Sequence, residues 1–238
     1  MSFIELIASD GFTLGAYRSD PTGVPRGAVV VVQEIFGVNS HIRSVADRFA
    51  AEGYVAIAPA VFDRAERGVE LGYDAAGMKR GVDIAFALDM DLVMADVAAA
   101  VSLGAEILSE AEILSEAEIL SEAESGPVFV VGYCFGGTIA ARAAIEIGAI
   151  AAAVGYYGSG IARSLLDRRP NVPLLLHYGE LDHGIPLTDV DEVRVAWPEV
   201  EVMVHAGAGH GFNCDQRESF SPEASAQAWR STLEFLAR

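Results

Sequence analysis

Cysteine is scarce in this chain of 238 residues. Two cysteines are too few for a disulfide framework, and free thiols suit a reducing compartment. Basic residues are also few, since 16 Lys and Arg face 34 Asp and Glu, and the formal net charge of −18 repels nucleic acid and anionic membrane surfaces. Aromatic residues make up only 8%, but the hydrophobic share of 52% is ordinary for a globular enzyme and excludes a disordered chain.

Two further features are missing. We find no apolar run of about 20 residues, which a membrane-spanning helix requires. Residues 1–5 lack the basic segment and the long apolar stretch of a secretory signal. We therefore expect a cytoplasmic protein with no nucleic-acid partner and no membrane partner.

Short β-rich runs alternate with longer helical patterns, which is typical of an α/β fold with a mainly parallel sheet covered by helices on both faces. The turn dipeptide Asp10-Gly11 predicts an opening hairpin. The strands are expected at 3–8, 12–17, 28–32, 54–58, 128–131, 151–156, 174–177 and 200–204, and the helices at 40–52, 89–101, 138–147, 189–197 and 222–237. Residues 63–86 show no firm periodicity and predict a loop with a short helix. We find no domain boundary and expect a single domain over 1–238.

Residues 105–122 repeat Ala-Glu-Ile-Leu-Ser-Glu three times without change, and Ala-Glu follows. These are helix-forming residues, so the segment at about 105–124 should extend the preceding helix. Each residue advances about 100° around a helix, so a repeat of six residues places the three Ile-Leu pairs on three different faces. One interpretation is that this extension packs on another copy of the protein, and the other is a long, partly frayed excursion.

A glycine-flanked cysteine follows a strongly apolar run. Residues 128–137 read Val-Phe-Val-Val-Gly-Tyr-Cys-Phe-Gly-Gly, with Cys134 between Gly132 and Gly136. This strand, turn and helix context is that of a G-x-S-x-G nucleophile elbow with cysteine in place of serine. The glycines fit because the turn is strained and leaves no room for side chains. The alternative is that Cys134 is only a small buried hydrophobic residue.

The order of the remaining polar residues fits a catalytic triad. In α/β-hydrolases the acid and then the histidine follow the nucleophile along the chain. Asp182 comes just after the predicted strand at 174–177, with Glu180 as the alternative acid. His210 follows the last predicted strand in a glycine-rich loop, and four other histidines compete with it: His41, His177, His183 and His205. In this interpretation His210 takes the thiol proton and Asp182 orients the imidazole.

Together with Gln-Glu-Ile-Phe-Gly at 33–37 and His-Gly-Phe at 210–212, these motifs resemble the dienelactone hydrolase family over nearly the whole chain outside the repeats. The resemblance implies an α/β-hydrolase fold and hydrolysis of a cyclic enol ester in the breakdown of aromatic compounds. It also implies that Glu34 holds the resting Cys134, although a capping role for Glu34 is the alternative. The backbone N–H groups of Ile35 and Phe135 would form the oxyanion hole.

The chain departs from the family pattern where a substrate carboxylate is bound. The family places an arginine four residues after the histidine, where this chain has Cys214, and Arg217 follows three residues later. Lys79 and Arg80 are further candidates from the segment before the long helix. The substrate is therefore either a dienelactone-like lactone or a broader range of carboxylic esters. A catalytically silent ligand-binding or assembly protein is the third hypothesis. We expect no cofactor and no metal, because zinc-ligand spacing and a phosphate-binding glycine motif are both missing.

Overall fold

The computed structural model describes residues 1–116 and 126–238, with side chains up to residue 112 in the first range. Eight strands form one sheet in the order β1-β2-β4-β3-β5-β6-β7-β8. The first two strands and β4 pair antiparallel, and all other neighbours are parallel. The strands are β1 (Ser2–Ile7), β2 (Thr13–Ser19), β3 (Ala28–Val32), β4 (Val55–Pro59), β5 (Val128–Tyr133), β6 (Ala152–Tyr156), β7 (Leu174–Gly179) and β8 (Glu201–His205).

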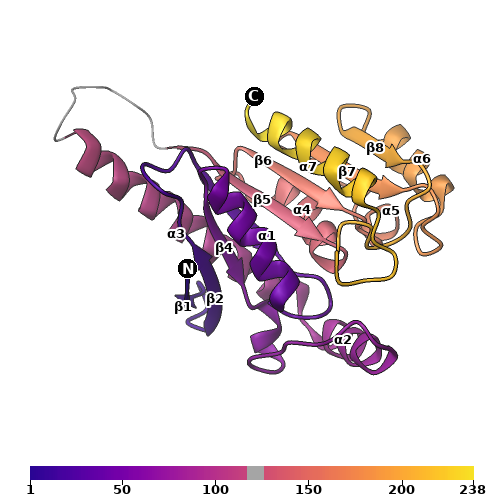
Figure 1. Cartoon of the computed structure of the whole chain (residues 1–238), viewed down its shortest axis with the longest axis horizontal. Coiled ribbons are helices and arrows are strands. Elements are labelled where there is room, and N and C mark those ends of the chain that lie inside the picture. The colour runs from indigo at the N-terminus through magenta and orange to yellow at the C-terminus, as the bar shows by residue number, and fades with distance from the viewer. Residues whose placement is uncertain (117–125) are drawn as a thin grey trace.

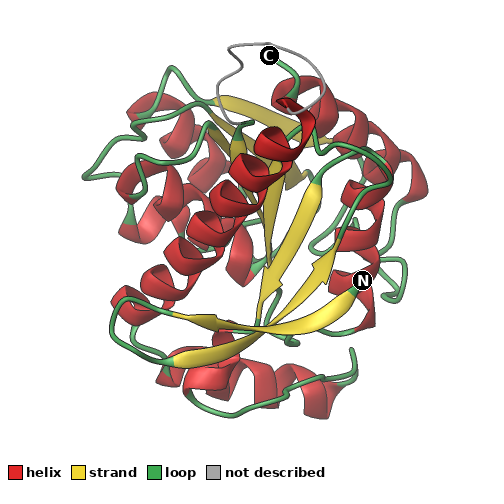
Figure 2. Cartoon of the chain, turned by 90° about the vertical axis from the view of Figure 1, so that its left-hand side faces the viewer, coloured by secondary structure: helices red, strands yellow, loops and turns green. Residues whose placement is uncertain are grey.

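Helices cover the sheet on both sides (Figures 1 and 2). On one face α1 and α7 lie side by side, where the rings of Phe49 and Trp229 contact each other at a tilt of 50°, with centroids 4.6 Å apart. The other face carries α3 and α4, which pack on β3 and β5. The helices are α1 (Ser40–Ala51), the 3₁₀ turn η1 (Val61–Arg64), α2 (Ala75–Ala87), α3 (Met90–Glu116), α4 (Phe135–Glu146), α5 (Ile161–Ser164), α6 (Leu187–Ala196) and α7 (Pro222–Leu236).

The eight predicted strands, the opening hairpin and the sheet with helices on both faces are confirmed, with ends that differ by one or two residues. The structure differs between the fourth and fifth strands. The segment 63–86, predicted as a loop with a short helix, carries most of the thirteen-residue helix α2. Helix α3 continues past residue 101 into the repeats, as the prediction of a helical extension required. The short helix α5 was not predicted at all. The weak periodicity of α2 has a physical cause, because only Gly77, Gly81 and Ile84 of this helix are buried.

The first hexapeptide repeat packs against its own chain. Leu108 is buried in the main core and Ile107 is partly buried beside it, while Glu106 and Glu110 are exposed. The helix continues through the second repeat to Glu116, the last residue described before the gap, and the rest of the predicted extension, 117–124, lies outside the described residues. Self-association through this segment stays a prediction.

Helix α3 also meets a membrane-span criterion that the sequence reading did not anticipate. Residues 90–112 are long enough and apolar enough to cross a membrane, by length and composition only. The core helix of a soluble protein passes the same criterion. In this structure the apolar side of α3, including Val93, Val97 and Val101, is buried against the sheet.

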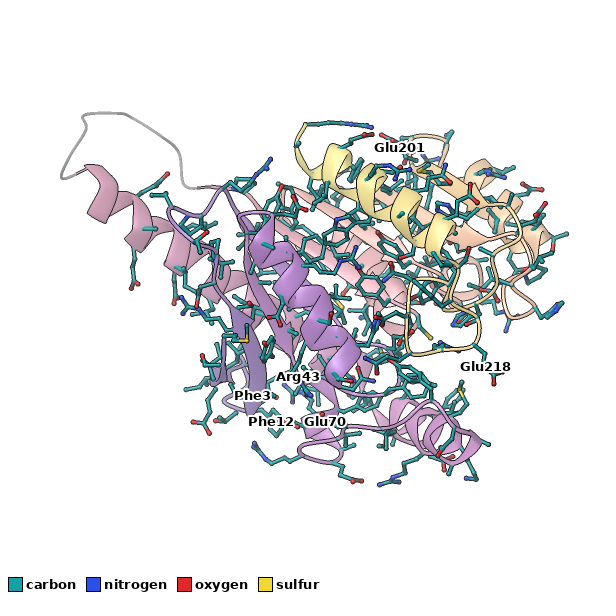
Figure 3. All side chains as sticks on the ribbon, in the orientation of Figure 1. Phe3, Phe12, Arg43, Glu70, Glu201 and Glu218 are labelled. Atoms are coloured by element: carbon teal, nitrogen blue, oxygen red, sulfur yellow. The ribbon has the colours of Figure 1, made fainter. Side chains whose placement is uncertain are left out.

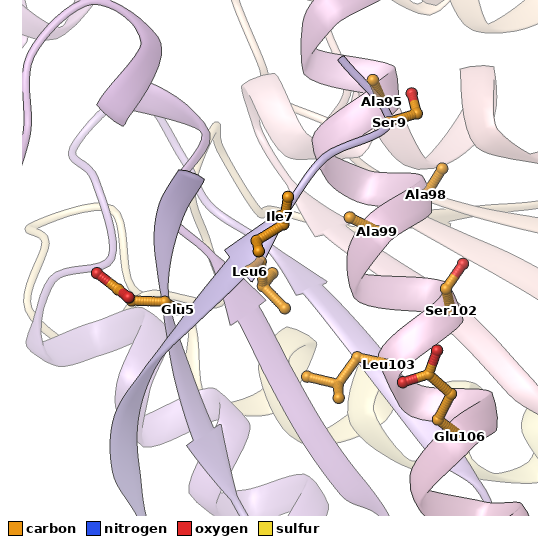
Figure 4. Close-up of a pocket in the computed structure, with 10 residues that line it drawn as sticks. All are labelled: Glu5, Leu6, Ile7, Ser9, Ala95, Ala98, Ala99, Ser102, Leu103 and Glu106. Carbon is orange, nitrogen blue, oxygen red and sulfur yellow. The ribbon is translucent and has the colours of Figure 1, made fainter. Parts of the chain in front are cut away.

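A shallow hollow of about 450 Å³ lies between β1 and the outer side of α3 (Figure 4). Its lining includes Leu6 and Ile7 of β1 and the small residues Ala98 and Ala99 of the helix. This hollow shares no lining residue with the cavity described next, and neither a cysteine nor a histidine is among the residues that line it.

Candidate active site

Cys134 lies at the sharp turn between β5 and α4. Its backbone has φ 54° and ψ −113°, a left-handed conformation that non-glycine residues rarely adopt. The Cys134 N–H donates to the carbonyl of Tyr156 on the neighbouring strand β6, and the Gly136 N–H donates to the carbonyl of Gln33 after β3. The turn is therefore fixed to the strands on both sides, as expected for a strained backbone at a functional position.

The two flanking glycines are required by sterics. A Cβ atom on Gly132 would lie 1.8 Å from the carbonyl oxygen of Gly136. A Cβ atom on Gly136 would lie 2.3 Å from the carbonyl oxygen of Val32 on β3. No side chain fits at either position, so these glycines allow strand, turn and helix to pack closely around Cys134.

A line of hydrogen bonds connects Cys134, His210 and Asp182. The Nε2 atom of His210 lies 3.1 Å from Sγ of Cys134, and Nδ1 lies 2.7 Å from Oδ2 of Asp182. Asp182 is buried, and its Oδ1 accepts the N–H of Gly184 at 2.8 Å. The sequence prediction placed these three residues together, and the structure brings them together. Their geometry is that of a nucleophile, a base and an orienting acid.

The loop that carries His210 is held against the end of β7. A Cβ atom on Gly179 would collide with the carbonyl oxygen of Ala208 at 2.5 Å, so glycine permits this contact. Glu180, the alternative acid, accepts the N–H of Gly207 at 2.8 Å and thereby fastens the same loop. Glu180 supports the backbone of the histidine loop, whereas Asp182 contacts the imidazole itself.

The surroundings of His210 favour its protonated form. Burial lowers the pKa of this histidine, but hydrogen bonds from the ring to Asp182 and Cys134 outweigh burial and raise the pKa to about 10. The imidazole is therefore a stronger base than free histidine and can accept a proton from the adjacent thiol.

Glu34 is fully buried just after β3, and its neighbours differ from those predicted. Glu34 was expected to hold Cys134. In this structure the hydrogen-bond partner of Cys134 Sγ is His210 instead. Glu34 instead accepts the Tyr73 hydroxyl at 3.2 Å and pairs with the guanidinium of Arg217 at 3.4 Å. Arg217 lies close over Gly211, whose φ of 76° and missing side chain leave room for it.

Tyr73 lies in the loop part of the segment 63–86, and it was not predicted from the sequence as a site residue. Its hydroxyl accepts the side-chain amide of Asn39 at 3.0 Å, and burial together with the Glu34 charge raises its pKa, so it stays a hydrogen-bond donor. The loop is fastened to α1 and β1 near Arg43, which pairs with Glu70 at 2.7 Å and lies over the ring of Phe3 (Figure 3). No periodic signal marks such a residue, because its position depends on contacts between segments far apart in sequence.

The two predicted oxyanion donors flank the turn. Phe135 is the first residue of α4, where a helix N–H has no partner within the helix. Ile35 follows Glu34, and its carbonyl packs against α2 so closely that a Cβ on Gly81 would lie 2.0 Å away. Both residues line the same cavity as Cys134.

This cavity has a volume of about 1150 Å³ and opens above Cys134 and His210. Its walls come from α2 and the α2–α3 connection, the start of α4, α5 and the loops after β7 and β8. Arg217, one of the three candidate substrate-binding cations, is among its lining residues. Lys79 and Arg80 are not, because they lie on the outer side of α2, paired with Asp83 and Glu66.

The other histidines have structural surroundings. His177 and His205 are buried together beneath the site, with His177 Nδ1 3.1 Å from His205 Nε2. His41 is buried on α1, with Nδ1 3.5 Å from Asp215. His183 is exposed beside Asp182 at the cavity wall.

One group among the described residues could hold a metal ion. Ligand atoms of Glu34, His41 and Cys214 lie within 4.8 Å of one another, and all three residues are buried. The Arg217 guanidinium already neutralises Glu34 at this place. Burial, followed by the Glu34 charge, raises the pKa of Cys214 to about 11, so the thiol would have to lose a strongly held proton to bind a cation. These two features oppose metal binding.

Comparison with known proteins identifies the family. The model of the dienelactone hydrolase family matches residues 14–238. A Synechocystis sp. protein with the provisional name carboxymethylenebutenolidase is 34% identical over 97% of this chain and 94% of its own length. The carboxymethylenebutenolidase of Pseudomonas putida is 31% identical over 98% of this chain and 95% of its own.

A solved structure agrees with these relatives. The crystal structure of a provisionally named dienelactone hydrolase from Klebsiella pneumoniae subsp. pneumoniae MGH 78578 has a TM-score of 0.79, 29% sequence identity and full coverage of both chains. The chain therefore belongs to the dienelactone hydrolase family and is a hydrolase with the α/β-hydrolase fold.

Proposed function

We propose that this protein hydrolyses a small lactone or ester, with Cys134 as the nucleophile, His210 as the base and Asp182 as the orienting acid. The observation that carries the proposal is the unbroken line from Asp182 Oδ2 through the imidazole to Cys134 Sγ, at 2.7 and 3.1 Å, at the wall of a large cavity. The raised pKa of His210 gives the ring the basicity that this role needs.

The reaction runs in two halves. His210 takes the thiol proton while sulfur attacks the carbonyl carbon, and the N–H groups of Ile35 and Phe135 stabilise the oxyanion. The tetrahedral intermediate collapses, the C–O bond breaks, and His210 returns the proton to the leaving alkoxide. Water then attacks the thioester with His210 as the base, which releases the carboxylic acid and restores the thiol.

The Glu34–Arg217 pair supports a substrate that carries a carboxylate. A carboxylate that binds Arg217 competes with Glu34 for the same guanidinium, since the two groups have the same charge and acceptor geometry. This is the basis for proposing a dienelactone-like substrate, as in the named relatives, and a role in aromatic degradation in the cytoplasm. A broader carboxylesterase is the second candidate, and the largely apolar lining from α2 favours it.

Substitution of the nucleophile tests the proposal. Cys134→Ala should abolish turnover of p-nitrophenyl acetate and of a dienelactone while the circular dichroism spectrum and unfolding midpoint stay close to those of the wild type. Cys214→Ala is the matched control, because Cys214 is buried and does not line the cavity. Undiminished turnover by Cys134→Ala would end the proposal. A wild type that cleaves neither substrate would favour the third hypothesis, a catalytically silent protein.

A further inference from the structure

Helix α2 presents three distinct faces, and one of them is an apolar wall of the cavity. At about 100° per residue, Met78, Val82, Ala85 and Phe86 share one arc of the helix. All four line the cavity that contains Cys134. Gly77, Gly81 and Ile84 form the arc buried against the protein, while Lys79, Arg80 and Asp83 form the charged arc that faces solvent.

Large apolar side chains are exposed at this wall. Phe86 is 87% exposed and Met78 37% exposed, and Leu181, next to the acid Asp182, is 56% exposed. These three residues lie around one cavity, and Leu88, Met90 and Leu165 add to its apolar lining. Single exposed apolar residues are common, but a group of them around a reactive sulfur indicates a ligand that covers them.

The positive charges of the cavity are already largely paired. Arg142 binds Asp91 and Glu146, Arg168 binds Glu146, and Arg217 binds Glu34. Arg163 is mostly exposed and lies 4.0 Å from Asp189. The apolar wall therefore offers the larger continuous surface to a substrate. The volume of about 1150 Å³ lies slightly above the range of about 300–1,000 Å³ for pockets that hold drug-sized ligands, and it is much more space than a small lactone fills.

We propose that the substrates of this site are neutral esters with a flexible apolar arm of several carbons, which packs along Met78, Val82 and Phe86 of α2 while the ester group lies at Cys134. This inference rests on the proposed function and develops its second candidate, the broader carboxylesterase, rather than a substrate with a carboxylate at Arg217. Each methylene that leaves water for the α2 wall should improve kcat/KM roughly fourfold until the wall is covered. Because such contacts hold the bound ester and its transition state alike, the gain should lie mainly in KM.

Two homologous ester series test this inference with the full-length protein. The first is p-nitrophenyl acetate, butyrate, hexanoate and octanoate, which lengthens the acyl side, and the second is ethyl to hexyl acetate, which lengthens the alcohol side. We expect kcat/KM to rise with chain length in at least one series. Val82→Ser should lower the ratio of long-chain to short-chain kcat/KM roughly tenfold or more, and Asp83→Ser, its neighbour on the solvent face, should leave that ratio unchanged.

The outcomes separate this inference from the proposed function. If the wild type cleaves acetate esters through Cys134 but kcat/KM stays flat or falls in both series, the apolar arm is wrong and the triad stands. If an ester with a terminal carboxylate is preferred over its neutral analogue of equal length, the inference is also overturned. If Val82→Ser unfolds the protein, Met78→Ser, at a partly exposed position, takes its place with the same expected loss.

Discussion

At the scale of single residues, the glycines beside Cys134 determine whether the sulfur can occupy its turn. Gly132→Ala would drive a methyl group into the Gly136 carbonyl, so we expect a loss of about 1–3 kcal/mol in the free energy of unfolding and a nearly complete loss of esterase activity. Gly148→Ala is the control, because nothing lies within 4 Å of its added Cβ. Urea unfolding and p-nitrophenyl acetate assays measure both effects, and a stable, active Gly132→Ala enzyme would refute the steric argument.

The charge of Asp182 should affect how activity depends on pH. In the proposed mechanism the active form holds one proton between sulfur and imidazole, and this form is lost when His210 deprotonates, near its raised pKa of about 10. Asp182→Asn removes one of the groups that raise this pKa. We expect the alkaline limb of the kcat/KM profile to move to lower pH and the maximum to fall roughly 10²–10⁴-fold.

Glu180 supplies the matched control for this profile. Glu180→Gln leaves the contact between Asp182 and His210 in place and alters only the support of the Gly207 loop. Its alkaline limb should coincide with that of the wild type. If Glu180→Gln moved the limb and Asp182→Asn did not, the roles of the two acids would be reversed.

The residues of the site differ in how far sequence could predict them. Cys134, Asp182 and His210 each follow a strand, and parallel strands bring such positions to one edge of the sheet, so their order along the chain predicted their proximity. The partners of Glu34 could not be predicted in this way. Arg217 and Tyr73 reach it from irregular loops, and Lys79 and Arg80 are turned outward by the helical phase of α2, which the sequence reading did not resolve.

At the scale of elements, a buried ion pair fastens α3 to η1. Asp96 is fully buried and pairs with Arg64 through two hydrogen bonds of 2.7 and 2.8 Å. Arg64→Met leaves this carboxylate buried without its partner, which should lower the free energy of unfolding by about 3–5 kcal/mol. Urea denaturation checks the value.

Two further variants test whether the unpaired charge of Asp96 causes the loss of stability. Arg64→Met combined with Asp96→Leu should recover much of the lost stability, because no charge then remains buried. Arg67→Met, three residues away on an exposed side chain, should cost less than about 1 kcal/mol. Equal losses for Arg64→Met and Arg67→Met would contradict the assignment.

The elements also show where sequence patterns fail. Buried strands such as β3 and β5 are continuous apolar runs, and their positions were predicted to within about two residues of the observed ends. Helix α2 buries a narrow glycine-rich side and exposes apolar residues to a cavity, so its hydrophobic pattern is that of neither a core helix nor a surface helix. The continuation of α3 into the first two repeats was predicted from their helix-forming residues. Which side of that helix is buried could not be predicted, because the Ile-Leu pairs turn around it.

At the scale of the whole molecule, neutral buried histidines link stability to pH. Burial, and then the neighbouring His205, lowers the pKa of His177 well below its usual value, and burial also lowers the pKa of His205 and His41. The unfolded chain binds these protons near pH 6.5 and the folded chain does not. Stability should therefore be full above about pH 6.5 and fall below it, by up to about 1.4 kcal/mol per pH unit for each such histidine.

Urea unfolding between about pH 7 and pH 5 measures this slope. His177→Gln keeps a polar side chain beside Thr232 and removes one titrating group, so its slope should be smaller by up to one proton. His183→Gln, at an exposed position, should keep the wild-type slope. An unchanged slope in His177→Gln would show that other groups, such as carboxylates, control the acid limit.

The account as a whole depends on a covalent bond to the sulfur of Cys134. The most direct measurement is mass spectrometry of enzyme quenched in acid during turnover of p-nitrophenyl acetate, followed by peptide mapping. We predict one acetyl group on the peptide that contains Cys134, and none in Cys134→Ala. An acetyl group on Cys214 instead, or full turnover with a serine or histidine acylated and Cys134 unmodified, would contradict the account.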